Sequence, residues 1–191
     1  MEFKSLGIKG AWLAKSKIHY DDRGSFQEWF KFTDIQNSIG VRFDVKQSNV
    51  SKSSKGVLRG IHYSLAPKGQ AKWVTCIAGR VIDLVIDLRP NSPTFKKFEL
   101  IELNGDDDQA IIVGPGLGHG FISLEDRSII SYLMDSPYSP NEEFDINPLD
   151  PDLAINWPLD LIGGASGLKL SKKDSKAPKL AERAAANQLP K

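Results

Sequence analysis

The 191-residue sequence contains a single cysteine, Cys76, and only three histidines. One cysteine excludes an internal disulfide and a metal cluster held by thiolates. Cys76 lies in the apolar stretch WVTCIAG, and a cysteine in such a stretch is most often a small core residue. We therefore expect Cys76 to be buried and to take no part in chemistry.

The sequence also lacks an excess of charge of either sign, and it lacks long hydrophobic runs. Lys and Arg together number 25 against 24 for Asp and Glu, so there is no electrostatic footprint for nucleic acid or for an anionic membrane. No stretch approaches the roughly 18 apolar residues of a membrane span, and the N-terminal residues do not have the pattern of a secretory signal. We expect a cytoplasmic protein that binds neither nucleic acid nor membranes.

Short apolar segments dominate the middle of the sequence. Between residues 45 and 134, runs rich in Val, Ile, Thr, Phe and Tyr alternate with clusters of Gly, Pro, Asn and Asp. This spacing predicts an all-β sandwich or barrel and argues against βαβ units. The expected strands are 45–50, 57–63, 70–77, 80–88, 98–103, 110–113, 119–124 and 128–134, with turn signals between them that include APKG at 66–69.

Helical periodicity is confined to two short segments. One covers residues 33–39, with Thr33 as its candidate N-cap, and the other is LAERAAANQL near the end of the sequence. Neither is long enough to cover a sheet. We expect one domain over residues 1–175, followed by a C-terminal tail over residues 176–191 that is either a loose helix or disordered.

The stretch over residues 136–158 is rich in Pro, Asn and Asp, which makes both a helix and a long strand hard to sustain. It nevertheless contains large apolar side chains that require burial. These are Tyr138, Phe144, Leu153, Ile155 and Trp157. We therefore expect an ordered strap that packs against the β-sheet core.

Polar residues interrupt several of the apolar strands. They are Gln47, Asn49, Arg59, His62, Lys72, His119 and Tyr132. Each one alone is most simply a surface or edge residue. Alternate residues of a strand share a face, so Gln47 and Asn49 fall on one surface. Together these residues predict the lining of a polar pocket inside a barrel.

Two of these residues require a local irregularity to face the same pocket. Arg59 and His62 have opposite parity along their strand, but Gly60 lies between them. An isolated glycine in a strand often marks a bulge. The orientation of Asp83 is a similar question. Asp83 faces the pocket only if its own face of strand 80–88 is the inner one, but the opposite face of this strand is more uniformly apolar. We assign Asp83 a supporting role.

Two glycine and histidine segments have the layout of the short motifs of cupins, the double-stranded β-helix barrels. Gly56, His62 and Gly79 belong to the first motif, and GPGLGHGF is the second. Metal-binding cupins carry a second His two residues after the first and a Glu seven residues before the closing Gly. Ser64 and Lys72 stand at these two positions. Because an ammonium group repels a metal ion, this resemblance implies a cupin-like barrel with no metal.

Longer segments give a more specific match. They are DDRGSFQEWF (21–30), QSNVSKSSKGVLRGIHY (47–63), GQAKWVTCIAGRVIDLVIDLRPNSPTF (69–95), GPGLGHGF (114–121), SYLMDSPYSPNEE (131–143) and LSKKD (170–174). In order and spacing, the sequence resembles the dTDP-4-dehydrorhamnose 3,5-epimerases of deoxysugar biosynthesis. One departure follows His62, where Ser64 and Leu65 replace the Gln that is usual in rhamnose-pathway enzymes. The GQAK segment is more similar to that of relatives in antibiotic-sugar pathways.

The resemblance implies an isomerase that needs no cofactor. It would epimerise C3 and C5 of dTDP-4-dehydro-6-deoxy-D-glucose to give dTDP-4-dehydro-L-rhamnose. In the implied roles, His62 is the base, Lys72 donates to the enolate oxygen and Tyr132 is the acid on the opposite face. Asp174 is the carboxylate that orients His62. Without the resemblance, the sequence favours Tyr132 as a buried structural tyrosine. Asp174 is then as well explained as a solvated residue of a charged tail.

The resemblance further implies a set of contacts to the nucleotide sugar. The residues are Arg23, Glu28, Gln47, Asn49, Arg59, His119, Glu143 and Lys173. Arginine suits a diphosphate because its planar guanidinium pairs with two phosphate oxygens at once. A homodimer is also implied, in which the N-terminal strands cross to the partner and bring Arg23 and Glu28 into a shared pocket.

Three alternatives stay open at this point. The first is a mono-epimerase or a 3,4-ketoisomerase of another dTDP-deoxysugar pathway. The second is a metal-dependent cupin oxygenase, against which Ser64 and Lys72 argue. The third is a sugar-binding cupin without activity, which has no need for so many acid and base groups in one pocket.

Overall fold

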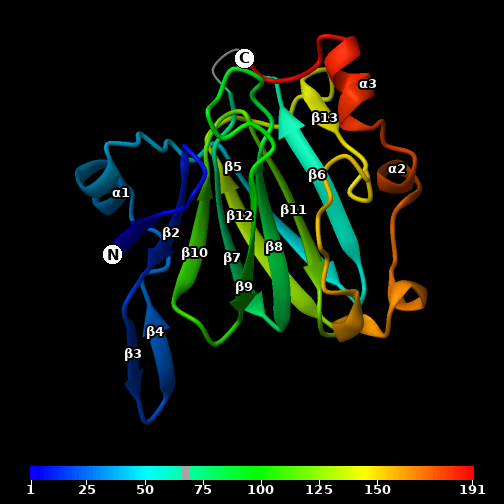
Figure 1. The fold of residues 1–191 in the computed structure, drawn as a ribbon. Coiled ribbons are helices and arrows are strands. Elements are labelled where there is room, and N and C mark those ends of the chain that lie inside the picture. The colour runs from blue at the N-terminus through cyan, green and yellow to red at the C-terminus, as the bar shows by residue number, and fades with distance from the viewer. Residues whose placement is uncertain (66–68) are drawn as a thin grey trace.

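The computed structural model describes residues 1–65 and 69–191. Most of the regular structure in this part of the chain is β-strand (Figure 1). The strands are β1 (Glu2–Ser5), β2 (Ala11–Lys15), β3 (Ile18–Asp21), β4 (Gly24–Gln27), β5 (Gln47–Ser53), β6 (Leu58–Ser64), β7 (Lys72–Ala78), β8 (Arg80–Asp87), β9 (Phe98–Asn104), β10 (Gln109–Val113), β11 (Leu117–Ser123), β12 (Ser128–Met134) and β13 (Glu143–Asp145). The helices are α1 (Phe32–Ile39), α2 (Lys172–Ser175) and α3 (Leu180–Ala185), with 3₁₀ turns η1 (Leu159–Ile162) and η2 (Ala165–Gly167).

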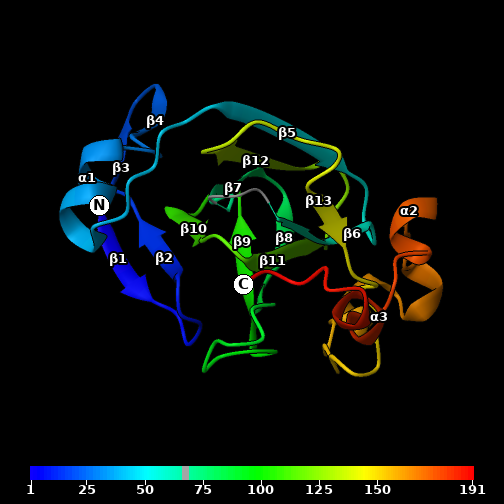
Figure 2. The same cartoon turned by 90° about the horizontal axis from the view of Figure 1, so that it is seen from above.

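The strands form two antiparallel sheets that lie face to face, as the view from above shows (Figure 2). The six-stranded sheet has the order β1-β2-β10-β7-β12-β5, and the five-stranded sheet has the order β13-β6-β11-β8-β9. Strands β3 and β4 pair with each other in a separate hairpin. Most neighbouring strands in these sheets come from distant parts of the sequence, as in a jelly roll. The prediction of an all-β, cupin-like fold is confirmed, although the described strands do not close into one continuous barrel.

All eight predicted strands are present, with boundaries shifted by a few residues. The turn expected at APKG falls largely on residues 66–68, which lie outside the described part of the chain. The apolar pattern did not predict β1 to β4 or β13. These strands have only three to five residues, which is too short for apolar alternation to stand out.

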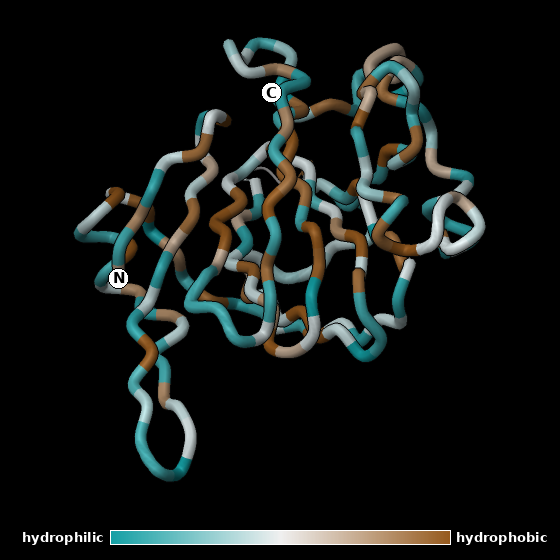
Figure 3. Tube along the Cα trace, turned by 60° about the horizontal axis from the view of Figure 1, so that its bottom comes forward, coloured by the Kyte–Doolittle hydropathy of each residue, from teal (hydrophilic) through white to brown (hydrophobic). Residues whose placement is uncertain are grey.

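Apolar side chains from both sheets fill the space between them. This cluster includes Val74 of β7, Val85 of β8, Phe121 of β11 and Ile130 of β12. Cys76 belongs to the same cluster and is 4% exposed. Burial raises the pKa of its thiol to about 11, and the prediction of Cys76 as a small core residue is confirmed. Figure 3 shows the hydrophobic segments concentrated in the strands and the hydrophilic ones in the connecting loops.

The outer face of the six-stranded sheet is covered by α1 and the segment that follows it. Ile35 of α1 and Phe43 pack there against Trp73 of β7 and Ile112 of β10. The helix predicted over residues 33–39 is therefore present. Its N-cap is Lys31, which makes no side-chain capping bond, so the prediction of Thr33 as the N-cap is wrong.

The strap and the C-terminal residues cover the outer face of the five-stranded sheet, with α2 and α3 beside β6 and β13 (Figures 1 and 2). Leu153 and Trp157 are buried as expected, whereas Tyr138 is 55% exposed, so the expected burial of Tyr138 is wrong. Leu180 and Leu189 of the predicted tail belong to the same cluster. The division of the chain at residue 175 stays a prediction. No helix in the described residues is long and apolar enough to cross a membrane.

The bulge predicted at Gly60 is present where β6 pairs with β11. His62 lies opposite His119, and Arg59 lies opposite Phe121, so β6 has one more residue than β11 between the two pairs. Because of this shift, Arg59 and His62 line the same cavity despite their opposite parity. A Cβ atom on Gly60 would lie 2.7 Å from Gly120 Cα and 2.8 Å from the carbonyl oxygen of His119.

We expect Gly60→Ala to lower the free energy of unfolding by about 2 to 4 kcal/mol, because the added methyl meets backbone atoms at a positive φ. Gly40→Ala is the matched control, since Gly40 also has a positive φ but nothing lies within 4 Å of its Cβ. Its expected loss is about 1 to 2 kcal/mol. Urea unfolding of both variants measures the difference. Equal losses would show that close packing on β11 does not constrain the bulge.

Candidate active site

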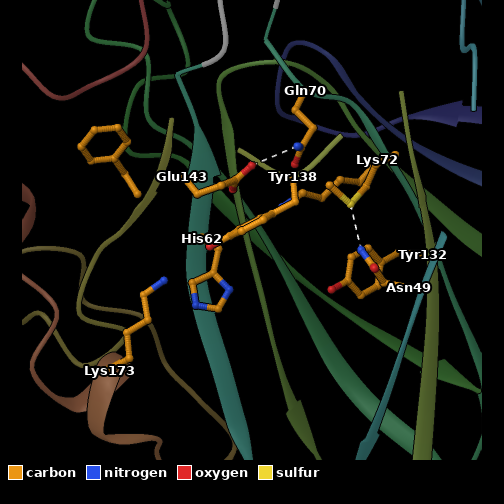
Figure 4. A pocket seen from close by; sticks show the side chains of 10 residues that line it. Asn49, His62, Gln70, Lys72, Tyr132, Tyr138, Glu143 and Lys173 are labelled. Atoms are coloured by element: carbon orange, nitrogen blue, oxygen red, sulfur yellow. Dashed lines mark hydrogen bonds between the residues drawn. The ribbon is translucent and has the colours of Figure 1, made fainter. Parts of the chain in front are cut away.

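A polar cavity lies between the two sheets (Figure 4). It has two sections, of about 190 and 140 Å³, which share His62, Lys72 and Tyr132 as lining residues. His62 comes from β6 of the five-stranded sheet, whereas Lys72 and Tyr132 come from β7 and β12 of the six-stranded sheet. The cavity thus has an imidazole on one side and an ammonium group and a phenol on the other.

A carboxylate from α2 holds the His62 ring. His62 Nε2 lies 2.8 Å from Oδ1 of Asp174, which is 5% exposed. Ser171 caps the helix, because its hydroxyl accepts from the backbone N–H of Asp174 and donates to Oδ2 of the same residue. Burial opposes ionisation of Asp174, but the hydrogen bonds from His62 and Ser171 outweigh it and lower the pKa of this carboxyl. When Nε2–H of His62 donates to the carboxylate, Nδ1 carries the lone pair that can accept a proton.

Lys72 is a buried cation without a close counter-ion. Its exposed fraction is 8%, and burial lowers the pKa of its ammonium, an effect that Glu143 and Asp83 offset only in part. No carboxylate of the described residues lies within 4.0 Å of its Nζ. Such a group can stabilise negative charge that develops on a ligand in the cavity.

Tyr132 lies on β12, between Asn49 of β5 and Val74 of β7. Burial raises the pKa of its phenol, and nearby Ser51, Arg59 and Asn49 counteract this in part. The phenol therefore keeps its proton at neutral pH and can act as a donor from the side of the six-stranded sheet.

His119 and Asp83 form a second buried pair in the cavity wall. His119 Nε2 lies 2.8 Å from Oδ2 of Asp83, whose side chain is fully buried. Burial raises the pKa of the Asp83 carboxyl, while His119 and Lys72 act in the opposite direction. Val81 and Val85 pack in the cluster between the sheets, so Asp83 follows the phase of β8 that faces the cavity.

The structure brings most of the other predicted substrate contacts to this cavity. Asn49, Glu143 and Lys173 line the larger section, and Arg59 lines the smaller one together with His119. Gln47 lies behind Asn49. Nε2 of Gln47 donates a hydrogen bond to Oδ1 of Asn49 at 3.0 Å. Gln47 Oε1 accepts from the backbone N–H of Tyr138 at 2.7 Å, which holds the strap at the cavity.

Two predicted contacts lie away from the cavity. The side chain of Arg23, in the turn of the β3–β4 hairpin, is 89% exposed and pairs with Asp21. The side chain of Glu28, just after β4, is 63% exposed and lies 3.7 Å from Lys31. The hairpin extends from the body of the molecule (Figure 1), so this chain alone does not bring Arg23 and Glu28 to its own cavity.

Seven lining residues were absent from the predicted set. They are Ser51, Gln70, Gly120, Phe121, Met134, Tyr138 and Phe144. Four of these, Ser51, Gln70, Phe121 and Met134, lie two residues from a predicted member in or beside the same strand, so the period-two rule was the signal that could have found them. Tyr138 and Phe144 belong to the strap, which has no extended periodicity from which to predict a face.

The donor set of the cavity does not fit a metal ion. No group of three or more His, Cys, Asp or Glu side chains in residues 1–65 and 69–191 is placed to hold one. His62 and His119 each direct a ring nitrogen to a carboxylate. Lys72 places a cation where a metal-binding cupin has an acidic ligand.

Comparison with known proteins gives a consistent result. The profile of the dTDP-4-dehydrorhamnose 3,5-epimerase family matches residues 5–182. A curated dTDP-4-dehydrorhamnose 3,5-epimerase from Mycobacterium tuberculosis is 41% identical over 191 residues, covering 100% of this chain and 93% of the relative. The solved structure of an rmlC epimerase from the same organism superposes with a TM-score of 0.95 at 41% identity, covering 100% of this chain and 94% of that one.

Two further solved structures contain sugar nucleotides. ChmJ, a 3'-monoepimerase from Streptomyces bikiniensis in complex with dTDP-quinovose, has a TM-score of 0.90 and 42% identity, covering 97% of this chain and 91% of that one. The RmlC epimerase of Legionella pneumophila, in complex with dTDP-4-keto-L-rhamnose, has a TM-score of 0.91 and 34% identity, covering 100% and 97%. With a family match over nearly the whole length and relatives above 40% identity, the chain belongs to the dTDP-4-dehydrorhamnose 3,5-epimerase family.

Proposed function

We propose that this protein epimerises C3 and C5 of dTDP-4-dehydro-6-deoxy-D-glucose, giving dTDP-4-dehydro-L-rhamnose. One observation carries the proposal: His62 and Tyr132 line one cavity from facing sheets, with buried Lys72 between the same walls. Inversion at a carbon next to a ketone needs a base on one face of the ring and an acid on the other. The two sheets supply these groups from opposite sides.

The proposed proton transfers follow from this arrangement. His62 Nδ1 removes the proton from the carbon next to the C4 ketone, and Asp174 stabilises the resulting imidazolium. Lys72 donates to the oxygen of the enolate, where its positive charge acts on negative charge that forms only during the reaction. Tyr132 then delivers a proton to the opposite face of the same carbon. Exchange with solvent restores the protonation of both groups before the second carbon reacts.

The polar residues around this set are suited to a nucleotide sugar. Arg59 and Lys173 supply positive charge for the diphosphate. Asn49, Glu143 and His119 line the cavity and offer hydrogen bonds to the sugar, and Gln47 supports Asn49. Bound dTDP sugars in the solved structures of ChmJ and of the Legionella enzyme support this class of ligand. We propose that the protein works in the cytoplasm, where sugar nucleotides are made.

We further propose that two copies of the chain form a homodimer in which the β3–β4 hairpin reaches the partner's cavity. Tyr20 and Phe26, on opposite faces of this hairpin, are 74% and 67% exposed, and aromatic side chains are enriched at protein interfaces. Arg23 lies between them in sequence, and its hydrogen bonds within the described residues go only to Asp21 of the same hairpin. In the dimer, Arg23 and Glu28 add to the diphosphate and sugar contacts of the partner.

Mono-epimerisation is the second candidate function, because ChmJ, at 42% identity, is a 3'-monoepimerase. Deuterium incorporation separates the two activities. In deuterated water, the purified protein is expected to load deuterium at both C3 and C5 of the keto sugar, as read by NMR. Label at C3 alone would identify a mono-epimerase. Without any label, the remaining candidates are a 3,4-ketoisomerase and a sugar-binding cupin.

Substitution of the base and of the acid should give different defects. We expect His62→Asn to abolish both turnover and solvent exchange, because no other cavity group is arranged to remove the proton. Tyr132→Phe removes one hydroxyl, so we expect net epimerisation to fall about 10²- to 10⁴-fold while deuterium still enters with retained configuration. NMR measures exchange and inversion in one sample. Normal epimerisation by Tyr132→Phe, or normal exchange by His62→Asn, would show that the assigned roles are wrong.

Sedimentation velocity at micromolar concentration should show a species of two chains. We expect the double variant Tyr20→Ser with Phe26→Ser to shift toward the monomer and to lose activity, because Arg23 no longer reaches the partner's cavity. Ile77→Ser is the matched control, since Ile77 is 52% exposed but lies on β7 away from the hairpin. An active wild-type monomer would contradict the proposed dimer.

A further inference from the structure

Gln70 is a cavity residue to which the proposed mechanism gives no role. It lies two residues before Lys72, is 5% exposed, and lines the larger section of the cavity. Its Nε2 donates to Oε1 of Glu143 at 3.0 Å (Figure 4). This contact fixes the orientation of the amide, because the reverse orientation would place the amide oxygen against a carboxylate oxygen.

The other end of the same amide is an unsatisfied acceptor. Gln70 Oε1 is buried and has no hydrogen-bond partner among the described residues. Buried polar atoms are almost always paired, and an unpaired one next to a cavity is a reason to look for a ligand group. An amide oxygen only accepts hydrogen bonds, so the missing partner is a donor such as a hydroxyl.

The chemistry of the proposed reaction restricts which hydroxyl this is. Gln70 shares its cavity with His62, Lys72 and Tyr132, so it lies beside the sugar ring. In that ring, C1 bears the diphosphate, C4 is the ketone and C5 bears the methyl group. The hydroxyl on C3 moves when C3 inverts, whereas C2 keeps both its hydroxyl and its configuration. A fixed, buried acceptor suits the group that stays in place throughout the reaction.

We propose that Gln70 Oε1 accepts a hydrogen bond from the C2 hydroxyl of the sugar and thereby selects 2-hydroxy over 2-deoxy sugars. This inference rests on the proposed function, because it takes the keto sugar as the ligand. It makes Gln70 a specificity-determining residue with two contacts. Nε2 is anchored to Glu143, and that anchor holds Oε1 toward the ring.

We expect the preference for 2-hydroxy over 2-deoxy sugars to be strong. With a 2-deoxy sugar, Gln70 Oε1 stays buried and unpaired, and a site built to bind a hydroxyl rejects the analogue that lacks it. A curated relative from Streptomyces antibioticus, 39% identical over 156 residues, is named a probable 3,5-epimerase of a 2,6-dideoxy sugar. The family thus includes proteins named for each kind of sugar, so discrimination at C2 is a property that differs within it.

Binding measurements test the inference without depending on turnover. The probes are dTDP-quinovose, which has no ketone and does not react, and its 2-deoxy analogue. By calorimetry, the wild-type protein is expected to bind the 2-hydroxy probe about 5- to 50-fold more tightly. Gln70→Met, which keeps the length of the side chain, is expected to reduce this ratio to about twofold or less. Gln36→Met, an exposed position on α1, should leave the ratio unchanged.

Other roles for Gln70 give different results. If Gln70 only orients Glu143, Gln70→Met weakens binding of both probes by the same factor, and the unchanged ratio overturns the inference. If the donor belongs to the nucleotide, Gln70→Met also weakens binding of dTDP alone, which likewise overturns it. Gln70→Asn serves as a second variant should Gln70→Met fail to fold, because it keeps the amide but withdraws its oxygen, and the ratio should again fall. Failure of the proposed function shows separately, as absence of deuterium incorporation by the wild-type protein.

Discussion

Burial of charged groups between two apolar sheets is the constraint on which the rest of the site depends. A buried charge without a partner costs several kcal/mol, and the fully buried Asp83 and the nearly buried Asp174 each have a histidine as partner. Lys72 is the exception, because burial disfavours its charged form and no carboxylate in the described part of the chain lies within 4.0 Å of its Nζ. Its charge is best compensated when a ligand brings negative charge into the cavity. In the proposed reaction an enolate brings that charge, so the unfavourable position of Lys72 would become useful for catalysis.

The two-sheet architecture allows one cavity to place the proposed acid and the proposed base on opposite faces of a flat intermediate. In a single strand, alternate side chains point to opposite sides of one sheet and cannot enclose a ligand. Facing sheets allow β6 to present His62 from one wall while β12 presents Tyr132 from the other. The strap and α2 then close the side of the five-stranded sheet and bring Asp174 to the back of His62. The stereochemistry of the proposed reaction therefore depends on sheet packing as much as on the reactive groups.

Sequence patterns predicted those parts of the structure that depend on local rules. Strand periodicity located eight strands, and the isolated Gly60 indicated the bulge that lets Arg59 and His62 share a cavity. Other features depend on contacts between distant segments, which no local pattern contains. Asp174 lies 112 residues from His62 in a segment that reads as charged surface, so only the family resemblance indicated their contact. Gln70 followed the same alternation as Lys72 but was missed, because an amide next to a turn resembles an ordinary loop residue.

The groups proposed to transfer protons differ from the charged groups proposed to bind the nucleotide. The proposed acid, base and oxyanion donor all come from strands of one chain, and each is fixed by pairing or by packing. Among the residues that the structure describes, Arg59 and the exposed Lys173 are the cavity residues proposed to bind the diphosphate, while Arg23 extends away on the hairpin. A folded monomer of this kind could carry out proton transfer but would hold the charged end of the substrate weakly. In the proposed dimer the hairpin supplies the missing cation, so assembly affects how firmly the sugar is held over His62 without altering the groups that react.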